Sequence, residues 1–496
     1  MLTRLQIHGF KNLLDVDIAF GPFTCIAGAN GVGKSNHFDA IRFLSALAER
    51  PLNEAAASVR SESFGSSDTS SLFNRTGDSV MEEMELAAEM VIPRRGVDDL
   101  GQEAEATMTY LRYGLTLART ESGLEVRSES LRHLNKSDSR SNLGFPHKKA
   151  WRDSAVTGRR TSPFISTVSE AGQILIKLHN DGPRGYLGGG RPRPHIASRL
   201  PRSVLSSATN AAESPTVTLA RREMQAWRLL QLEPSALRAP DSYNAPHFMA
   251  PNGAHLPATL ARLTRWNRSR PPSDDLAADF EITREATYAE ISNRLAELIE
   301  DVYSIRIDAD DSRELLKLML KDLSGTEYEA KSLSDGTLRF LALAILESDP
   351  LAGGVFCLEE PENGIHPERI PAMLRLLKDL ATDPTAEVDE LNPLRQVIVN
   401  THSPAVVAQI EASDLLFVLQ QKTLQRGTMT TKPAFLWLDE TWRSHSRPEV
   451  PCAPAGRIRR YLTPIKSAGK DQKTRGSVRV VDRQEMLPFL VEADVA

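Results

Sequence analysis

Three short apolar runs predict buried strands. They cover Thr24–Ala27, Gly354–Leu358 and Arg395–Val399, and each contains mostly apolar residues rather than a strict alternation. Such runs are typical of parallel strands that helices cover on both faces. The first is followed by a helical pattern over Phe38–Ala48, so we expect a strand, a turn and a helix here.

Between the first and second runs the pattern changes. Residues Met84–Ile92, Ala106–Arg119 and Leu124–Ser130 alternate in polarity, which predicts an antiparallel sheet. Helical periodicity follows at Leu219–Leu232 and Arg284–Tyr303. Because the chain has no long heptad run, we expect a compact helical arm rather than an extended coiled coil.

Composition is typical of a reduced globular protein. The 496 residues are enough for more than one packed unit, and the net charge of −5 is mild. Of three cysteines, Cys25 and Cys357 lie in predicted core strands and Cys452 stands alone. The chain has no run of about eighteen apolar residues, so we expect a cytoplasmic protein with no membrane segment.

One segment has a charge opposite to that of the whole chain. Residues 131–212 contain 14 Lys and Arg against 4 Asp and Glu, and they are rich in Ser, Gly and Pro. This asymmetry favours a contact with nucleic acid. The alternative is a solvated insertion without a ligand, because charge-rich loops are common.

The turn after the first strand has the pattern G-x-x-x-x-G-K-S. The turn and the residue after it are Gly28, Ala29, Asn30, Gly31, Val32, Gly33, Lys34, Ser35 and Asn36. Between a strand and a helix this pattern predicts a phosphate-binding loop, whose glycines let successive N–H groups point at phosphate oxygens. We expect ATP as the ligand, with Lys34 at the β- and γ-phosphates and Ser35 on Mg²⁺.

Polar residues also follow the other two predicted strands. Glu359 and Glu360 end the second strand, and since side chains alternate along a strand, the two carboxylates must have different roles. We assign Glu359 to Mg²⁺ and Glu360 to the water that attacks the γ-phosphate. His402 follows the third strand and would approach the γ-phosphate from there. By themselves, strand-end acids are as often a solvated turn as a functional site, and a single histidine is more often structural, so these assignments depend on the loop.

Four segments occur in a fixed order along the chain. They are GANGVGKS (28–35), SLSDGTLRFLALA (332–344), VFCLEEPENGIHP (355–367) and VIVNTHSP (397–404). Together with the opening LTRLQIHGFKNL (2–13), they resemble the ATP-binding-cassette ATPases of the SMC/RecF/OLD class. The resemblance makes Ser334, Asp335 and Gly336 the signature that contacts a partner subunit's ATP, Glu360 the catalytic base and His402 the switch histidine. It implies a homodimer, or a higher homo-oligomer, closed head-to-tail around two ATPs.

Two features depart from that class. Its metal-side carboxylate is most often Asp, whereas this chain has Glu359, as some branches of the class do. The class also carries a glutamine near Mg²⁺. From the order of motifs in the class, this glutamine should lie in residues 64–80. That segment contains no glutamine, so the residue is not found where the class predicts it.

The expected fold class is α/β: a P-loop NTPase head of the ABC type with a mixed sheet core, an antiparallel β lobe and a compact helical or irregular insertion. The two halves of the head are predicted at residues 1–93 and 304–415. The other predicted segments are the β lobe (94–130), the basic insertion (131–218), the helical arm (219–303) and a C-terminal extension (416–496).

The resemblance implies an ATPase that acts as a nucleic-acid-linked switch. An OLD-type protein would continue into a Toprim nuclease with an Asp-x-Asp pair, but residues 415–496 contain none and Asp308–Asp311 fits a strand turn better. We therefore expect a separate nuclease-like effector, as for the stand-alone ATPases of anti-phage systems such as Septu. The alternative is a RecF-like factor that loads repair proteins on DNA, and the neighbouring genes would distinguish the two.

Overall fold

The computed structural model describes residues 1–59, 69–121, 123–134, 143–182, 192–265, 276–425, 428–447 and 450–462. It divides into two units, Met1–Pro454 and Ala455–Ala496. The second unit contains one described helix, α14 (Ala455–Leu462), and all other elements belong to the first. Within the described ranges, no helix is both long and apolar enough to cross a membrane.

A six-stranded sheet contains the three predicted buried strands. Its order is β14-β19-β20-β3-β21-β22, and all neighbours are parallel except the last pair. The strands are β3 (Phe23–Ala27), β14 (Arg228–Leu230), β19 (Gly354–Glu359), β20 (Arg395–Thr401), β21 (Leu415–Gln425) and β22 (Thr428–Trp437). Every residue of β3 and β20 is buried, which confirms the prediction from the apolar runs. The parallel pairing brings the carboxyl ends of β3, β19 and β20 to one edge of the sheet.

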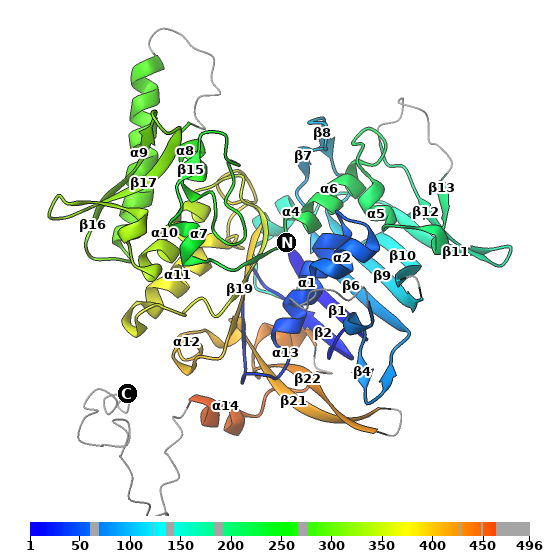
Figure 1. Cartoon of the computed structure of the whole chain (residues 1–496). Coiled ribbons are helices and arrows are strands. Elements are labelled where there is room, and N and C mark those ends of the chain that lie inside the picture. The colour runs from blue at the N-terminus through cyan, green and yellow to red at the C-terminus, as the bar shows by residue number, and fades with distance from the viewer. Residues whose placement is uncertain are drawn as a thin grey trace, which may run out of the picture. The chain divides into compact units, whose positions relative to one another are not determined.

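An eight-stranded antiparallel sheet forms a second layer (Figure 1), in the order β13-β12-β11-β10-β9-β6-β1-β2. The strands are β1 (Leu2–His8), β2 (Val16–Ala19), β6 (Glu83–Val91), β9 (Tyr110–Thr120), β10 (Gly123–His133), β11 (Ile165–Glu170), β12 (Gln173–Leu178) and β13 (Arg193–Ile196). β6, β9 and β10 confirm the strands predicted from alternating polarity. β11, β12 and β13 extend the sheet into the predicted basic insertion, of which residues 135–142 and 183–191 lie outside the described part.

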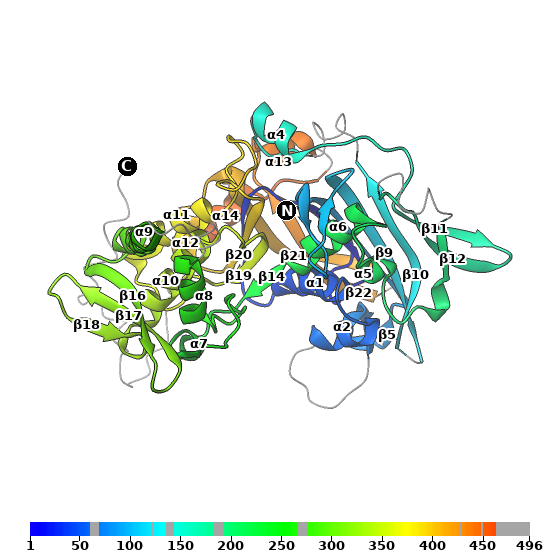
Figure 2. The ribbon, with the colours of Figure 1, turned by 90° about the horizontal axis from the view of Figure 1, so that it is seen from above.

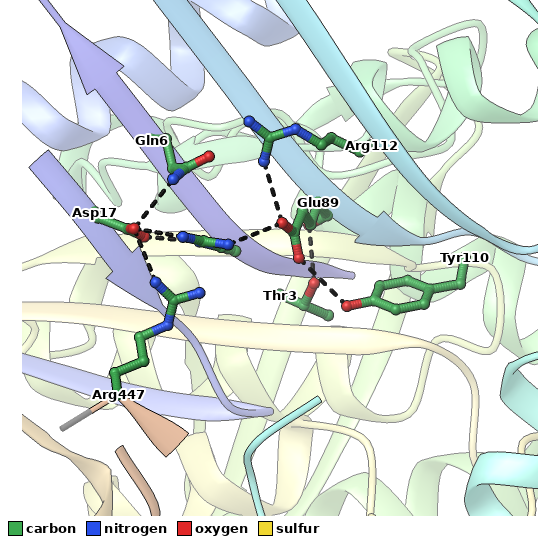
Figure 3. Close-up of polar contacts among 8 residues, drawn as sticks. Thr3, Gln6, Asp17, Glu89, Tyr110, Arg112 and Arg447 are labelled. Atoms are coloured by element: carbon green, nitrogen blue, oxygen red, sulfur yellow. Dashed lines mark hydrogen bonds and ion pairs between the residues drawn. The ribbon is translucent and has the colours of Figure 1, made fainter. Parts of the chain in front are cut away.

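One face of this antiparallel sheet is polar and is held together by charged pairs (Figure 3). Arg4 on β1 donates to Asp17 on β2 (2.8 Å) and to Glu89 on β6 (3.2 Å). Arg112 on β9 donates to the same Glu89 oxygen (3.1 Å), and Arg447 donates to Asp17 (2.8 Å). Burial alone would raise the pKa of Asp17, but the bonds from Arg4 outweigh it and lower that pKa. The pairs tie four strands and the segment around Arg447 into one unit.

Helices α1 (Ser35–Leu47) and α6 (Pro215–Gln225) lie between the two sheets (Figure 2). Phe38 on α1 belongs to one buried cluster with Ile26 of the parallel sheet and Leu86 of the antiparallel sheet. Because α1 is buried on both sides, the loop that joins it to β3 has a fixed position at the edge of the parallel sheet.

A third group of elements is a small sheet together with neighbouring helices. It comprises α7 (Pro234–Leu237), α8 (Leu256–Arg265), α9 (Leu276–Ala296), α10 (Asp335–Glu347), α11 (Ile370–Leu380), β15 (Asp241–Ser242), β16 (Val302–Asp310), β17 (Leu315–Asp322) and β18 (Glu327–Glu329). Helices α8 and α9 pack on the small sheet, and α7, α10 and α11 are the neighbouring helices. The remaining short elements are α2 (Leu52–Ser58), α4 (Lys149–Ala155), α5 (Val204–Ser207), α12 (Pro404–Val407), α13 (Trp442–Ser446), β4 (Arg75–Thr76), β5 (Ser79–Val80), β7 (Arg95–Val97) and β8 (Glu103–Glu105).

Two predicted helices are wrong at their C-terminal ends. The helix predicted over Leu219–Leu232 ends at Gln225, because residues 228–230 pair with β19 as strand β14. The helix predicted to continue to Tyr303 ends at Ala296, because β16 begins at Val302 and pairs with β17. At residues 228–230 the pairing partner, β19, is distant in sequence, so the local apolar pattern does not reveal it. β16 instead pairs with the next strand of the chain, β17, and its first residue, Val302, also fits the helical stripe.

A buried carboxyl group should make the stability of the protein depend on pH. Glu129 on β10 is fully buried and accepts hydrogen bonds from Val204 N (2.7 Å), Leu205 N (2.8 Å) and the Tyr113 hydroxyl (3.2 Å). Burial raises the pKa of Glu129 from 4.5 to about 7 despite these bonds. Because the folded pKa lies above the unfolded one, the stabilising contribution is complete below pH 4.5 and is lost as the pH rises through about 7. The free energy of unfolding should fall over this window, by up to about 1.4 kcal/mol per pH unit.

Urea unfolding of the wild type and of Glu129→Gln across this pH window measures the effect. The part of the slope due to Glu129 should be absent from Glu129→Gln and present in Glu103→Gln, which changes an exposed carboxylate on β8. Equal slopes in the wild type and Glu129→Gln would contradict the assignment.

Candidate nucleotide site

A glycine-rich loop joins β3 to α1. Gly31 (φ +77°) and Gly33 (φ +96°) adopt a left-handed backbone that favours glycine. At Gly33 a Cβ would lie 2.2 Å from Nδ2 of Asn12, and at Gly28 a Cβ would lie 2.6 Å from the carbonyl oxygen of Val418. A larger residue at position 28 or 33 would therefore push the loop away from its neighbours.

Lys34, at the end of this loop, folds its side chain back towards it. The ammonium donates to the carbonyl oxygens of Gly28 (2.6 Å) and Ala29 (2.9 Å). Burial lowers the pKa of Lys34, and the nearby carboxylates of Glu360 and Glu359 oppose that shift. The ammonium is thus placed where it would meet an anion bound by the loop.

A pocket of about 880 Å³ lies beside the loop, within the usual range for small-molecule sites. Its walls come from the loop, from the ends of β14, β19 and β20, and from α10. They include the predicted residues Asn30, Gly31, Gly33, Lys34, Ser35, Asn36, Glu359 and Glu360. Gly28, Ala29 and Val32 are not wall residues: the first two bind Lys34 through their carbonyls, and Val32 is buried in the core.

Glu360 and His402 meet at the ends of β19 and β20. Nδ1 of His402 is hydrogen bonded to Oε1 of Glu360, and Nδ2 of Asn363 donates to Oε2 (2.9 Å). The parallel register, in which Glu359 is opposite Asn400, brings these strand ends together. Burial alone would raise the pKa of Glu360, but the bonds from Asn363 and His402 outweigh it and lower the pKa. The carboxylate is therefore ionised at neutral pH.

Oxygen donors beside Lys34 fit a Mg²⁺ ion. Ser35 is exposed at the start of α1, and Glu359 ends β19. Asn400 on β20 is 2% exposed and lines the pocket, and neither polar atom of its amide has a hydrogen-bond partner among the described residues. Buried amides are normally paired, so this one indicates a polar ligand or a metal-bound water in the pocket. Hydroxyl, carboxylate and amide oxygens suit Mg²⁺, so the residues present fit the ion.

Ser334 lies at the surface and caps helix α10. Its Oγ accepts a hydrogen bond from the Thr337 N–H (3.1 Å). Asp335 is also exposed, and neither these two residues nor Gly336 is among the described residues that line the pocket. Arg339, in the next turn of the same helix, does line it. The helix therefore contributes to the pocket with its second turn and exposes its first.

Arg238, which directly follows α7, is bonded to two residues at the start of α10. It donates to the carbonyl oxygen of Leu333 (3.0 Å) and to the carboxylate of Asp335. α7 begins three residues after Gln231, which lines the pocket. The short segment from Gln231 to Arg238 thus connects the pocket to the residues at the start of α10.

Two residues that line the pocket were not predicted as pocket residues from the sequence. Gln231 follows β14, whereas we expected the class glutamine within residues 64–80, of which 64–68 lie outside the described part. The only local signal was a short apolar run that ends in glutamine. Asn12 accepts a hydrogen bond from Nδ2 of Asn36 (2.7 Å) and lies against the loop at Gly33. The sequence marked Asn12 only as part of the opening segment.

Two family models match the chain. One is described as "AAA domain, putative AbiEii toxin, Type IV TA system" and covers residues 228–408; the other is described as "AAA domain" and covers residues 4–106. These two segments contain β3, the glycine-rich loop, β14, β19 and β20. The chain contains an AAA domain. The domain is split in sequence and reassembled in space by the parallel sheet, which confirms the predicted P-loop NTPase fold. Comparison with curated proteins finds no match.

Solved structures similar to this AAA-domain chain include SMC heads. An Smc head bound to the C-terminal winged-helix domain of ScpA is 14% identical, with 88% of this chain and 98% of that chain covered and a TM-score of 0.44. The Smc head of Pyrococcus furiosus with an extended coiled coil, bound to the C-terminal domain of ScpA, is 14% identical, with coverages of 88% and 96% and a TM-score of 0.41. The SMC head of Thermotoga maritima is 12% identical, with coverages of 87% and 98% and a TM-score of 0.31. The roles of single residues, the dimer and the effector stay predictions.

Proposed function

We propose that this chain binds ATP with Mg²⁺ beside Lys34 and hydrolyses it. The observation that carries the proposal is Glu360, an ionised carboxylate that lines the same pocket as the phosphate loop and is bonded to His402. A carboxylate in that position can accept a proton from water as the water attacks the γ-phosphate.

The residues around the pocket have different roles in binding and hydrolysis. Lys34 and the loop N–H groups bind the phosphates, Glu360 accepts the proton of the attacking water, and His402 and Asn363 orient the Glu360 carboxylate. Mg²⁺, held by Ser35 and Glu359, supplies positive charge to the phosphate oxygens when bound. Gln231 takes the role of the class glutamine, since it directly follows β14, a strand parallel to β19, and lines the pocket.

The signature acts on the ATP of a second copy. The first turn of α10 has N–H groups without partners inside the helix, of which that of Thr337 is bonded to Ser334 Oγ, and the Ser334 side chain is exposed beside them. Ser334 does not line its own subunit's pocket, so two copies closing head-to-tail would let each signature reach the other's γ-phosphate. ATP is then part of the interface, and hydrolysis removes the contact that holds it.

Mixing two inactive variants tests this arrangement. Ser334→Arg should lower ATP hydrolysis about 10²-fold because the signature of each subunit is blocked. Lys34→Ala removes the phosphate loop's cation but keeps the signature, so a mixed dimer contains one intact composite site. Phosphate release from the mixture should exceed that of either variant alone. Activity in Ser334→Arg alone, or a mixture no more active than its parts, would contradict a site shared between subunits.

As a dimerising ATPase, the chain would serve as a switch for a separate nuclease-like effector and would contact nucleic acid. What supports the nucleic-acid contact is the surplus of Lys and Arg in residues 131–212. What supports a switch is the connection from Gln231 to the signature, because it couples nucleotide binding to the surface that meets a partner.

A further inference from the structure

A second pocket lies next to the nucleotide pocket. It has a volume of about 360 Å³ and is formed by the C-terminal half of α1, by β14 and by Pro251. Gln231 lines both pockets, so the two are adjacent. Trp227, Ala46 and Leu229 give the second pocket apolar walls.

Three arginines line this second pocket. Arg42 is exposed on α1, Arg50 follows the end of α1, and Arg228 is half-buried on β14. Among the described residues that line it, the only carboxylate is that of Glu49, which is 3.4 Å from Arg50. The pocket therefore has an excess of positive charge.

Arg42 and Arg228 have no hydrogen-bond or ion-pair partner among the described residues. Asp39, one turn before Arg42 on α1, is bonded to Lys11 (2.6 Å). Burial lowers the pKa of Arg228 while the charge of Asp349 opposes that shift, but Asp349 is itself paired with Arg262. Partly burying the Arg228 guanidinium without a paired carboxylate costs free energy, so an anion from outside the chain would stabilise it there, with the exposed Arg42 beside it.

The anion best suited to such a pocket is a phosphate group. Guanidinium groups bind phosphate oxygens in pairs of parallel hydrogen bonds, and three of them converge here from two elements. Apolar walls beside the charges suit a phosphate that carries an organic group. We propose that Arg42, Arg50 and Arg228 form a second phosphate-binding site, which takes the phosphate of either a free nucleotide or a nucleic-acid strand. Through Gln231, a ligand in this site contacts the wall of the nucleotide pocket.

The test uses the full chain carrying Lys34→Ala, so that phosphate binding at the loop does not contribute. Inorganic pyrophosphate is titrated by calorimetry, and a fluorescein-labelled single-stranded oligodeoxynucleotide is titrated by fluorescence anisotropy. In this background, Arg42→Glu together with Arg228→Glu should weaken binding about tenfold or more. Raising the salt from about 50 mM to about 200 mM should weaken it as well. Loss of pyrophosphate binding alone supports a free phosphate ligand, and loss of oligonucleotide binding supports a nucleic-acid strand.

Two further variants keep the test decisive. Arg375→Glu reverses an exposed arginine on α11 outside the pocket and should change affinity less than about twofold. Because Arg228 is half-buried, Arg42→Glu alone is also measured: Arg42 is exposed, so its reversal should weaken binding without lowering the melting temperature. Absence of binding to both probes, or equal binding by the double variant and the Arg375→Glu control, would overturn the proposal. Neither result depends on whether the chain hydrolyses ATP.

Discussion

Glu360→Gln is expected to lower the rate of ATP hydrolysis about 10²- to 10⁴-fold, the usual contribution of a general base, while ATP binding persists. Glutamine has nearly the shape of glutamate and can still contact Asn363, but it cannot accept the proton of the attacking water. The variant should therefore hold ATP in an unreacted state. Phosphate release measures the rate, and gel filtration with ATP should show a dimer that the wild type loses as it hydrolyses ATP.

Glu368→Gln is the matched control for this experiment. Glu368 follows the same strand, is 89% exposed and does not line the pocket. Its replacement should leave the rate unchanged. A Glu360→Gln protein that hydrolyses ATP at the wild-type rate and stays monomeric with ATP would contradict both the assigned base and the ATP-held dimer.

Lys34→Ala is expected to weaken ATP binding about 10²-fold or more. The ammonium lies against the phosphate loop, and charge-assisted hydrogen bonds to phosphate are among the strongest that a side chain forms. At an ATP concentration about 100 times the dissociation constant, binding stabilises a protein by about 2.7 kcal/mol. The rise in melting temperature that Mg²⁺ and ATP produce in the wild type should be absent from the variant.

Lys422→Ala is the control, because Lys422 is an exposed lysine on β21 outside the pocket. It should retain the full rise in melting temperature. The two principal variants are also controls for each other, since Glu360→Gln should keep the rise that Lys34→Ala loses. If Lys34→Ala is stabilised by ATP as strongly as the wild type, the nucleotide binds elsewhere.

The parallel strands and the phosphate loop could be predicted because their signals are local. A buried strand requires a short apolar run, and the loop requires glycine where Gly33 leaves no room for a Cβ beside Asn12. The helix predicted from Phe38 is present, and it begins at Ser35. Prediction failed at residues 228–230, because the sequence Arg-Leu-Leu is short enough to fit a helix end as well as a strand.

Gln231 illustrates the same limit within the site. The glutamine was expected after the first helix, in residues 64–80, because the class order suggested that interval. In the structure the glutamine at the pocket follows β14, and the register of β14 with β19 sets Leu229 opposite Cys357. Only this pairing between distant segments brings Gln231 to the sheet edge at which β19 ends with Glu359. No local pattern could therefore identify Gln231 as a pocket residue.

The sequence by itself determined the fold class of the protein and predicted which residue types would meet at its main pocket. The glycines of the loop allow its left-handed backbone, and the lysine beside them supplies a positive charge for phosphate. Acids that directly follow an apolar run lie at the end of a buried strand. Each of these features depends only on residues close together in sequence. The tertiary structure decided which of these groups lie together. The contact of Glu360 with His402, the unpaired amide of Asn400 and the convergence of Arg42 with Arg228 arise from pairing between segments far apart in the chain. Such pairing depends on burial of the whole core rather than on any one segment, which is why it appears only in the folded molecule.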